Sequence, residues 1–164
     1  MALTETRDNA GVIAPPPFIA LTAVVLGLAL DWLMPAYVLT VLLTLWERLI
    51  IAAIFLGAGT ALAIPALLGF HSAGTHVEPW KPASVLVTGG IFGWLRNPMY
   101  VGLTLFLIAL SMALASDWML VMTIVFTLVI HFGVVKREER YLEAKFGAAY
   151  RAYKAHVPRY GMPF

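Results

Sequence analysis

The chain has 164 residues, of which 61% are apolar and 12% are charged, a balance that excludes an ordinary soluble globular protein. Because the sequence contains no cysteine, disulfide scaffolds, thiol nucleophiles and cysteine-ligated metal centres are excluded as well. The formal net charge is only +2, but seven of the eleven lysines and arginines lie between Lys136 and Arg159. The length allows one domain, with a basic C-terminal region attached to a nearly uncharged remainder.

Three stretches are long and apolar enough to cross a bilayer, whose hydrocarbon core of about 30 Å needs about 20 helical residues. They are residues 49–70, 98–116 and 118–135. Only Asp117 separates the last two, so we expect these two spans to form a tight helical hairpin.

A fourth, shorter stretch, residues 18–34, contains Asp31 but is bounded by prolines as a helix would be. Three prolines precede it and Pro35 follows it. Residues 36–46 are apolar yet too short to cross the bilayer alone, so we expect them to extend the helix of the second span, 49–70.

The basic residues are distributed unevenly between the two sides that four spans create. Four spans place both termini and the loop 71–97 on one side, and this side holds every lysine and arginine except Arg48. Because basic loops stay in the cytoplasm, we expect an inner-membrane protein with both termini and this loop on the cytoplasmic side.

The segment after the last span predicts an amphipathic helix that lies against the membrane or the bundle. Its apolar residues recur at helical spacing: Leu142, Phe146, Ala149, Tyr150, Tyr153 and Val157. The sequence therefore predicts an all-α integral membrane bundle of about four transmembrane helices plus this C-terminal cytoplasmic helix.

Two polar clusters flank the hairpin of the last two spans, one from Gly74 to Tyr100 and one from Lys136 to Gly147. Since both lie at the same membrane surface, we expect them to meet in space. The run Arg96-Asn97-Pro98 in the first cluster has two interpretations. Either Arg96 reaches the lipid headgroups while Asn97 caps the next helix and Pro98 occupies its first turn, or the free amides at this helix start face an anionic or polar ligand.

The second cluster also has two interpretations. Glu138 and Glu139 are either solvated and neutralised by their basic neighbours, or they present a carboxylate to a cationic cofactor or a sugar diol. His131 lies seven residues before Glu138, roughly two helical turns, and a histidine in a span is either functional or a hydrogen-bonded core residue. His71 and His76 lack the spacing of paired ligands, so no metal site is predicted.

The two clusters, in this order and joined by a hairpin, resemble the isoprenylcysteine carboxyl methyltransferases and the related phospholipid methyltransferases. The first part of the motif is Leu86, Val87, Thr88, Gly90, Phe92, Arg96, Asn97, Pro98, Tyr100 and Gly102. The second part is Glu138, Glu139, Leu142, Phe146, Gly147, Tyr150, Tyr153, Val157, Pro158, Pro163 and Phe164. The resemblance covers residues 74–164, a little over half of the chain.

This resemblance implies S-adenosylmethionine-dependent methyl transfer to a lipophilic acceptor, with the cofactor under the cytoplasmic loops. It implies one membrane domain, 1–164, in which an N-terminal helical hairpin, 1–70, precedes a cofactor-binding core, 71–164. The positions that it assigns to the cofactor are Val77, Ser84, Val85, Leu86, Val87, Phe92, Asn97, Pro98, Met99, Tyr100 and Glu138. We assign catalytic roles to Arg96 and Glu139 and acceptor-binding roles to Arg137 and His131. The expected partners are the acceptor and membrane lipids, with no metal and no nucleic acid.

The sequence departs from the family pattern at three places. The usual Gly-Pro-Tyr-Arg run reads Gly-Ile-Phe-Gly at residues 90–93, Asn97 replaces a histidine, and Val134 replaces an arginine that binds the acceptor in eukaryotic members. Arg96, Arg137 and Arg140 are the candidates to substitute for that arginine.

Two other functions fit parts of the pattern. A sterol-reductase-like membrane enzyme would bind NADPH and needs phosphate-binding basic residues before the third span, where only Lys81 and Arg96 are present. A non-catalytic protein could bind anionic lipid through the basic tail, but this would leave both polar clusters without a role.

Overall fold

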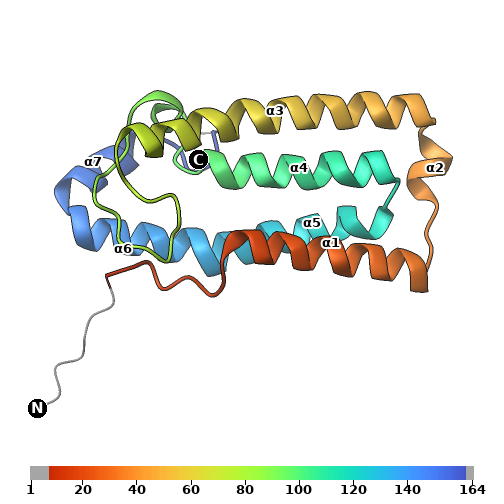
Figure 1. Cartoon of the computed structure of the whole chain (residues 1–164), viewed down its shortest axis with the longest axis horizontal. Coiled ribbons are helices and arrows are strands. Elements are labelled where there is room, and N and C mark those ends of the chain that lie inside the picture. The colour runs from red at the N-terminus through yellow and green to blue at the C-terminus, as the bar shows by residue number, and fades with distance from the viewer. Residues whose placement is uncertain (1–7, 162–164) are drawn as a thin grey trace, which may run out of the picture.

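The computed structural model describes residues 8–161, and every regular element within this range is a helix (Figure 1). In chain order these are α1 (Pro16–Leu33), α2 (Val38–Leu42), α3 (Leu45–Ser72), the 3₁₀ turn η1 (Gly90–Gly93), α4 (Pro98–Leu114), α5 (Asp117–Ile130), the π-helical turn η2 (His131–Val135), α6 (Lys136–Phe146) and α7 (Ala148–His156). The all-α prediction is confirmed. Arg7 and the motif residues Pro163 and Phe164 lie outside the described range.

The long helices are apolar enough to cross a membrane. Three helical stretches meet the length of a span, namely Pro16–Leu33, Leu45–Ser72 and the continuous rod Asp117–Phe146. The apolar helix α4 has 17 residues, which at 1.5 Å per residue is about 26 Å, and it lies between α3 and α5. The chain is therefore an integral membrane helical bundle.

The bundle is formed by two helix pairs, because α3 packs along α4 and α1 packs along α5. Small residues let these backbones approach closely. A Cβ atom on Gly102 of α4 would lie 3.0 Å from the carbonyl oxygen of Gly59 in α3, and one on Gly27 of α1 would lie 2.5 Å from Cα of Met119 in α5. The buried cluster between the pairs contains Ala20, Ala23, Leu107, Phe126, Ile130, Val134 and Val135.

The expected extension of the second span is wrong for residues 36–44 and correct for residues 45 and 46. The chain forms the separate helix α2 and then begins α3 at Leu45. Thr44 sets this start through a capping box, because its Oγ1 accepts a hydrogen bond from Glu47 N at 3.4 Å and Glu47 Oε2 accepts one from Thr44 N at 2.8 Å.

The expected hairpin is present, with α4 and α5 joined through Ala115 and Ser116. Ser116 caps α5 by accepting a hydrogen bond from Met119 N at 3.1 Å. The carboxylate of Asp31, the acidic residue of the first span, accepts hydrogen bonds from the Ser116 hydroxyl and from Trp118 N. Asp31 therefore ties the end of α1 to this turn.

The C-terminal amphipathic segment is two helices and not one. The helix α6 continues α5 through the π-helical turn η2, and the chain then breaks at Gly147 before α7. Gly147 has φ +55° and ψ −122°, a conformation that residues with a side chain rarely adopt. The prediction of one helix missed this turn because the apolar spacing continues across it.

We predict that Gly27→Ala lowers the free energy of unfolding in detergent by about 1–3 kcal/mol, because the added methyl group meets the α5 backbone. The matched control is Gly57→Ala, where nothing lies within 4 Å of the new Cβ, and it should be neutral or slightly stabilising. Equal destabilisation by both substitutions would contradict the close packing of α1 on α5.

Candidate functional site

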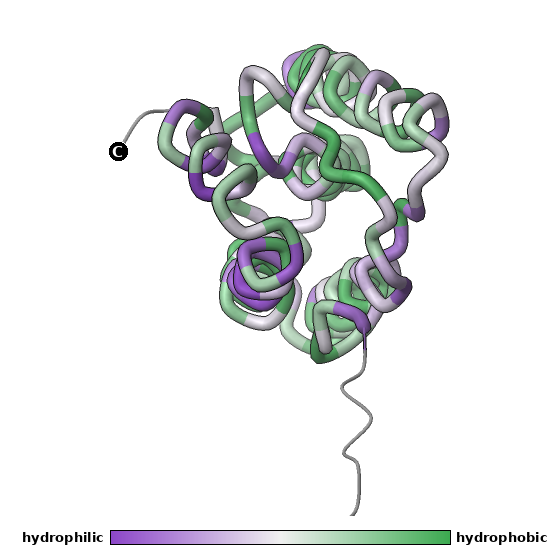
Figure 2. The backbone as a smooth tube through the Cα atoms, turned by 90° about the vertical axis from the view of Figure 1, so that its left-hand side faces the viewer, coloured by the Kyte–Doolittle hydropathy of each residue, from purple (hydrophilic) through white to green (hydrophobic). Residues whose placement is uncertain are grey.

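The two polar clusters meet at one end of the bundle, which we call the loop end because it carries the loop 73–97 together with α6, α7 and the C-terminal segment 157–161. Figure 2 looks onto this end and shows hydrophilic stretches in front of the apolar helices. Tyr100 at the start of α4 donates its hydroxyl to Glu138 Oε1 in α6 at 2.9 Å. Arg96 Nη1 lies 2.9 Å from Glu139 Oε1. The prediction that the clusters meet is therefore confirmed.

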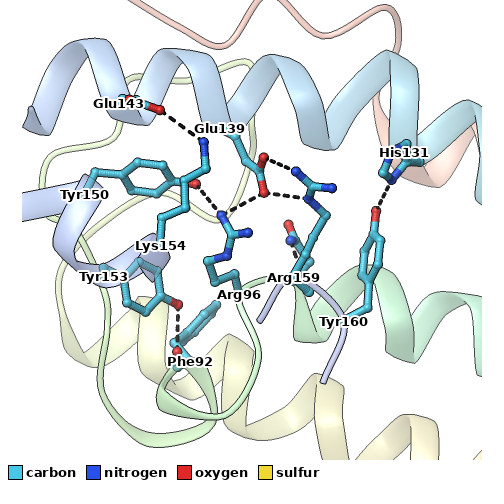
Figure 3. Close-up of polar contacts among 11 residues, drawn as sticks. Phe92, Arg96, His131, Glu139, Glu143, Tyr150, Tyr153, Lys154, Arg159 and Tyr160 are labelled. Carbon is cyan, nitrogen blue, oxygen red and sulfur yellow. Dashed lines mark hydrogen bonds and ion pairs between the residues drawn. The ribbon is translucent and has the colours of Figure 1, made fainter. Parts of the chain in front are cut away.

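Glu139 is the centre of a buried ion cluster (Figure 3). Its side chain is 9% exposed and that of Arg96 is 8% exposed, while Arg159 donates Nε and Nη2 to the two oxygens of Glu139 at 2.8 and 2.7 Å. This hydrogen bonding raises the pKa of the Arg159 guanidinium. One buried carboxylate thus holds two arginines from distant parts of the chain, and the bidentate pairing fixes the orientation of Arg159.

Two tyrosines of α7 hold the turn before α4. Tyr153 donates its hydroxyl to the carbonyl oxygen of Phe92 at 2.6 Å, and Tyr150 accepts a hydrogen bond from Arg96 Nη1 at 3.3 Å. Burial raises the pKa of Tyr150 to about 12, so its phenol stays protonated at neutral pH. Phe92 also packs edge-on against Phe70 at the end of α3, with 4.9 Å between ring centroids.

The start of α4 lacks the side-chain cap that was one expectation for Asn97. The side chain of Asn97 instead donates Nδ2 to the carbonyl oxygen of Arg159 at 3.3 Å. Pro98 occupies the first turn as expected and has no N–H to donate. The next N–H groups, those of Met99 and Tyr100, point out of the helix start and receive no side-chain cap from Asn97. This end of α4 therefore retains hydrogen-bond donors for a polar ligand.

Two cavities adjoin each other at this end. The smaller, about 80 Å³, lies under the loop, and its walls include Val85, Leu86, Val87, Glu139, Tyr150 and Tyr153. The larger, about 350 Å³, has walls from the starts of α1 and α4, from α3 and from the loop, and these include Pro16, Ala63, Val77, Trp80, Phe106 and Glu138. They share five wall residues, Phe70, Phe92, Arg96, Asn97 and Leu142.

Most of the predicted cofactor residues line these cavities. Beyond the shared residues Phe92 and Asn97, the smaller cavity contains Val85, Leu86 and Val87, and the larger contains Val77, Pro98, Met99, Tyr100 and Glu138. Arg96 lines both cavities and Glu139 lines the smaller one.

Three predicted residues line neither cavity. Ser84 stabilises the loop, because its Oγ donates to the carbonyl oxygen of Gly74 at 3.3 Å and its N–H donates to Thr75 Oγ1 at 3.1 Å. Arg137 is exposed and donates Nη1 to the carbonyl oxygen of Gly11 at 2.8 Å. His131 pairs its Nδ1 with the hydroxyl of Tyr160 at 2.8 Å. Their side chains therefore stabilise surrounding segments in this structure.

Sequence reasoning missed Arg159 and Phe70. Arg159 stands directly after the Val157-Pro158 pair of the motif, and this position could have identified it as a candidate site residue. Phe70 is the last residue of an apolar span, and nothing in the sequence distinguishes it from its neighbours. Among the described residues no group of three His, Asp or Glu side chains is placed to hold a metal ion.

Comparison with known proteins places this site in a family. The model of the family described as phospholipid methyltransferase matches residues 47–149, which run from the first turn of α3 past the end of α6 and contain both polar clusters. The chain belongs to the phospholipid methyltransferase family. No solved structure matches it.

Two relatives are similar to parts of the chain. The chain is 32% identical over 114 residues to the protein-S-isoprenylcysteine O-methyltransferase of Schizosaccharomyces pombe, a match that covers 66% of this chain and 47% of the relative. It is 44% identical over 62 residues to an uncharacterized protein of Haemophilus influenzae, covering 38% of this chain and 98% of that protein. The chain spans about half the length of the S. pombe relative.

We predict that Glu139→Gln destabilises the protein by about 3–5 kcal/mol, because it leaves the buried cation of Arg96 without its partner anion. The matched control is Glu143→Gln, which breaks the more exposed pair between Glu143 and Lys154 and should cost less than about 1 kcal/mol. Unfolding by denaturant in detergent measures both. Similar losses would show that the Glu139 cluster does not organise the loop end.

Proposed function

We propose that the protein is a membrane methyltransferase that takes its methyl group from S-adenosylmethionine and transfers it to a lipophilic acceptor. The observation that carries this proposal is the pair of adjoining cavities. One lies under the polar loop and the other extends between the helices. Ala63 lies seven residues from Phe70 along α3, so the larger cavity reaches about 10 Å from the loop end toward the bilayer interior. A water-soluble donor and a membrane-dissolved acceptor could therefore meet at Arg96 and Asn97.

The side chains at the junction suit the donor. S-adenosylmethionine supplies a methyl group activated on a cationic sulfur. The carboxylate of Glu138 and the aromatic ring of Phe92 are the kinds of group that attract such a cation. Among residues 8–161, Arg96 Nε is buried without a hydrogen-bond partner, and the N–H groups at the start of α4 lack a side-chain cap. These donors suit the carboxylate of the methionyl part.

Positioning is the chemical work left to the protein, because methyl transfer is an in-line displacement that needs no protein nucleophile. In this proposal Arg96 and Asn97 hold the reacting groups at the junction of the cavities. Glu139 acts by fixing Arg96, with which it forms an ion pair of 2.9 Å. The apolar residues of both cavities exclude water from the reacting atoms.

The charges around the cavities bear on the acceptor. Over residues 8–161, Arg96 is the one arginine or lysine that lines either cavity. It is paired with Glu139, and the proposal assigns its remaining Nε to the donor. Arg137 is exposed, and Arg140 donates to the carbonyl oxygen of Lys136 on its own helix. Because no unpaired cation faces the larger cavity from the described chain, we propose an acceptor that does not present a carboxylate.

The alternative functions gain little support from the structure. An NADPH-binding reductase would need free basic residues for phosphate, but Lys81 is paired with Glu78 at 2.7 Å and lines neither cavity. A purely lipid-binding protein would have no use for the buried cluster around Glu139. The methyltransferase remains our proposal.

We predict that S-adenosylmethionine and S-adenosylhomocysteine bind the detergent-purified protein in calorimetric titration, and that NADPH does not. Glu138→Gln should weaken binding of S-adenosylmethionine about tenfold, because glutamine cannot ionise to pair with the sulfonium. Asn97→Ala should weaken binding too, whereas Glu143→Gln should not. Unchanged affinity in both site variants would remove Glu138 and Asn97 from the proposed site.

We also propose that the loop end faces the cytoplasm, because the basic residues gather there. The chain lacks cysteine, so single introduced cysteines can report sidedness. A membrane-impermeant thiol reagent should label Tyr37→Cys in intact cells, and Glu143→Cys only after permeabilisation. The reverse pattern would invert the orientation.

A further inference from the structure

The segment before α1, residues 8–15, is bonded to three parts of the loop end, and we call it the N-terminal strap. Figure 1 shows it running along α6 on its way to α1. Its backbone pairs with the loop through Ala10 N and the carbonyl oxygen of Pro79 at 3.3 Å, and with η2 through Ile13 N and the carbonyl oxygen of Gly133 at 3.3 Å. The strap thus lies across α6 and the loop without being part of a helix.

Tyr141 of α6 connects the strap to the loop. Its hydroxyl donates to Asp8 Oδ1 at 2.8 Å and accepts a hydrogen bond from Ala83 N at 3.0 Å. Lys145 Nζ lies 2.7 Å from both oxygens of Asp8 and 3.0 Å from the Tyr141 hydroxyl. A phenol has one hydrogen to donate and two lone pairs to offer, so these three contacts use the whole hydroxyl.

The direction of the hydroxyl hydrogen determines what Tyr141 can do for the loop. Hydrogen bonds from Lys145 and Tyr141 lower the pKa of Asp8, which is therefore an anion at neutral pH and can only accept. With its hydrogen directed at Asp8, the Tyr141 oxygen presents a lone pair to the N–H of Ala83. Asp8 therefore acts on the loop through Tyr141.

Ala83 stands at the start of the loop stretch that forms the smaller cavity. Ala83, Val85, Leu86 and Val87 all line this cavity. On its other side Ser84 is held by its hydrogen bond to Thr75. The Asp8–Lys145 pair is half exposed, with side chains 57% and 27% exposed, and such a pair contributes little to stability by itself. The larger effect of the Asp8–Lys145 pair is to orient Tyr141 against the loop.

We propose that Tyr141, oriented by Asp8 and Lys145, is a positioning residue that sets the backbone of the donor-binding loop at Ala83. This inference rests on the proposed function, since it assigns the smaller cavity to the methyl donor. It extends that site to the N-terminal strap, which lies outside the region matched by the family model.

The test compares Tyr141→Phe with the wild-type protein in two measurements. The KM for S-adenosylmethionine, or its Kd where no acceptor is at hand, should rise about five- to tenfold, because the hydrogen bond that holds Ala83 is lost with the hydroxyl. The kcat at saturating donor should stay within about twofold, because no group at the reacting atoms changes. Hydrogen–deuterium exchange of residues 75–89 in the unliganded protein should become faster.

A second variant and a matched control make the outcome specific. Asp8→Ala should reproduce the effects of Tyr141→Phe, and the double variant should be no worse than Tyr141→Phe alone, because Asp8 acts through Tyr141. Asp8 lies outside every helix, so this variant tests the proposal even where Tyr141→Phe folds poorly. Tyr37→Phe makes the same chemical change at the opposite end of the bundle and should change neither measurement.

The two proposals fail in different ways. If the wild-type protein binds no S-adenosylmethionine, the proposed function fails, and exchange at residues 75–89 alone decides the role of Tyr141. Unchanged exchange in Tyr141→Phe and Asp8→Ala overturns the positioning role whatever the donor does. Additive effects of the two substitutions, or a kcat that falls as much as affinity, would also overturn it.

Discussion

The loop end depends on one buried anion, the carboxylate of Glu139. An ionised carboxylate that is removed from water costs several kcal/mol unless opposite charges and hydrogen bonds surround it. Arg96 and Arg159 supply both, from the turn before α4 and from the C-terminal segment (Figure 3). Because the guanidinium of Arg159 is held, its carbonyl oxygen is in place to accept a hydrogen bond from Asn97. The charge requirement of one side chain thus brings two distant segments, α6 and the C-terminal segment, to the start of α4.

Two short segments without helical structure then close the loop end from different sides. The C-terminal segment contacts the start of α4, since Arg96 N donates to the carbonyl oxygen of Pro158 at 3.0 Å. The N-terminal strap contacts the far side of the loop through Pro79 and Tyr141. Since the loop 73–89 contains no regular helix, these bonds supply order that secondary structure does not. The helices position the ends of the site, and the two segments determine the shape of its walls.

Much of this arrangement could be predicted from the sequence. Hydropathy located the helical stretches, because a bilayer admits few other backbone structures. The short hairpin after Arg96 predicted that the two polar clusters meet. The start of α3 was readable in the Thr44-x-x-Glu47 capping box, but apolar composition alone suggested a longer helix.

The orientation of His131 could not be predicted from spacing. A seven-residue separation places two residues on one face of an α-helix, but η2 inserts a π-helical turn between His131 and Glu138. Glu138 therefore faces Tyr100 and the larger cavity, while His131 faces Tyr160. Similarly, the side chains of the neighbouring residues Arg137 and Glu138 point in different directions along the helix, so Arg137 contacts Gly11 while Glu138 lines the larger cavity. Tertiary pairing partners such as Arg159 leave no periodic signal at all.

The distribution of the cavity walls along the chain limits what family membership can say about the acceptor. The match to the family covers residues 47–149 and so includes the loop, Arg96, Asn97 and both glutamates. The smaller cavity is built almost wholly from this region, with Tyr150 and Tyr153 directly after it. The larger cavity, by contrast, has Pro16 and Pro17 of α1 in its wall, and these precede the match. If the donor occupies the shared region, relatives can keep one donor cavity while the α1 wall of the larger cavity varies. Under the proposed function, the α1 wall is therefore where the acceptor of this chain can differ from the acceptor named for its S. pombe relative.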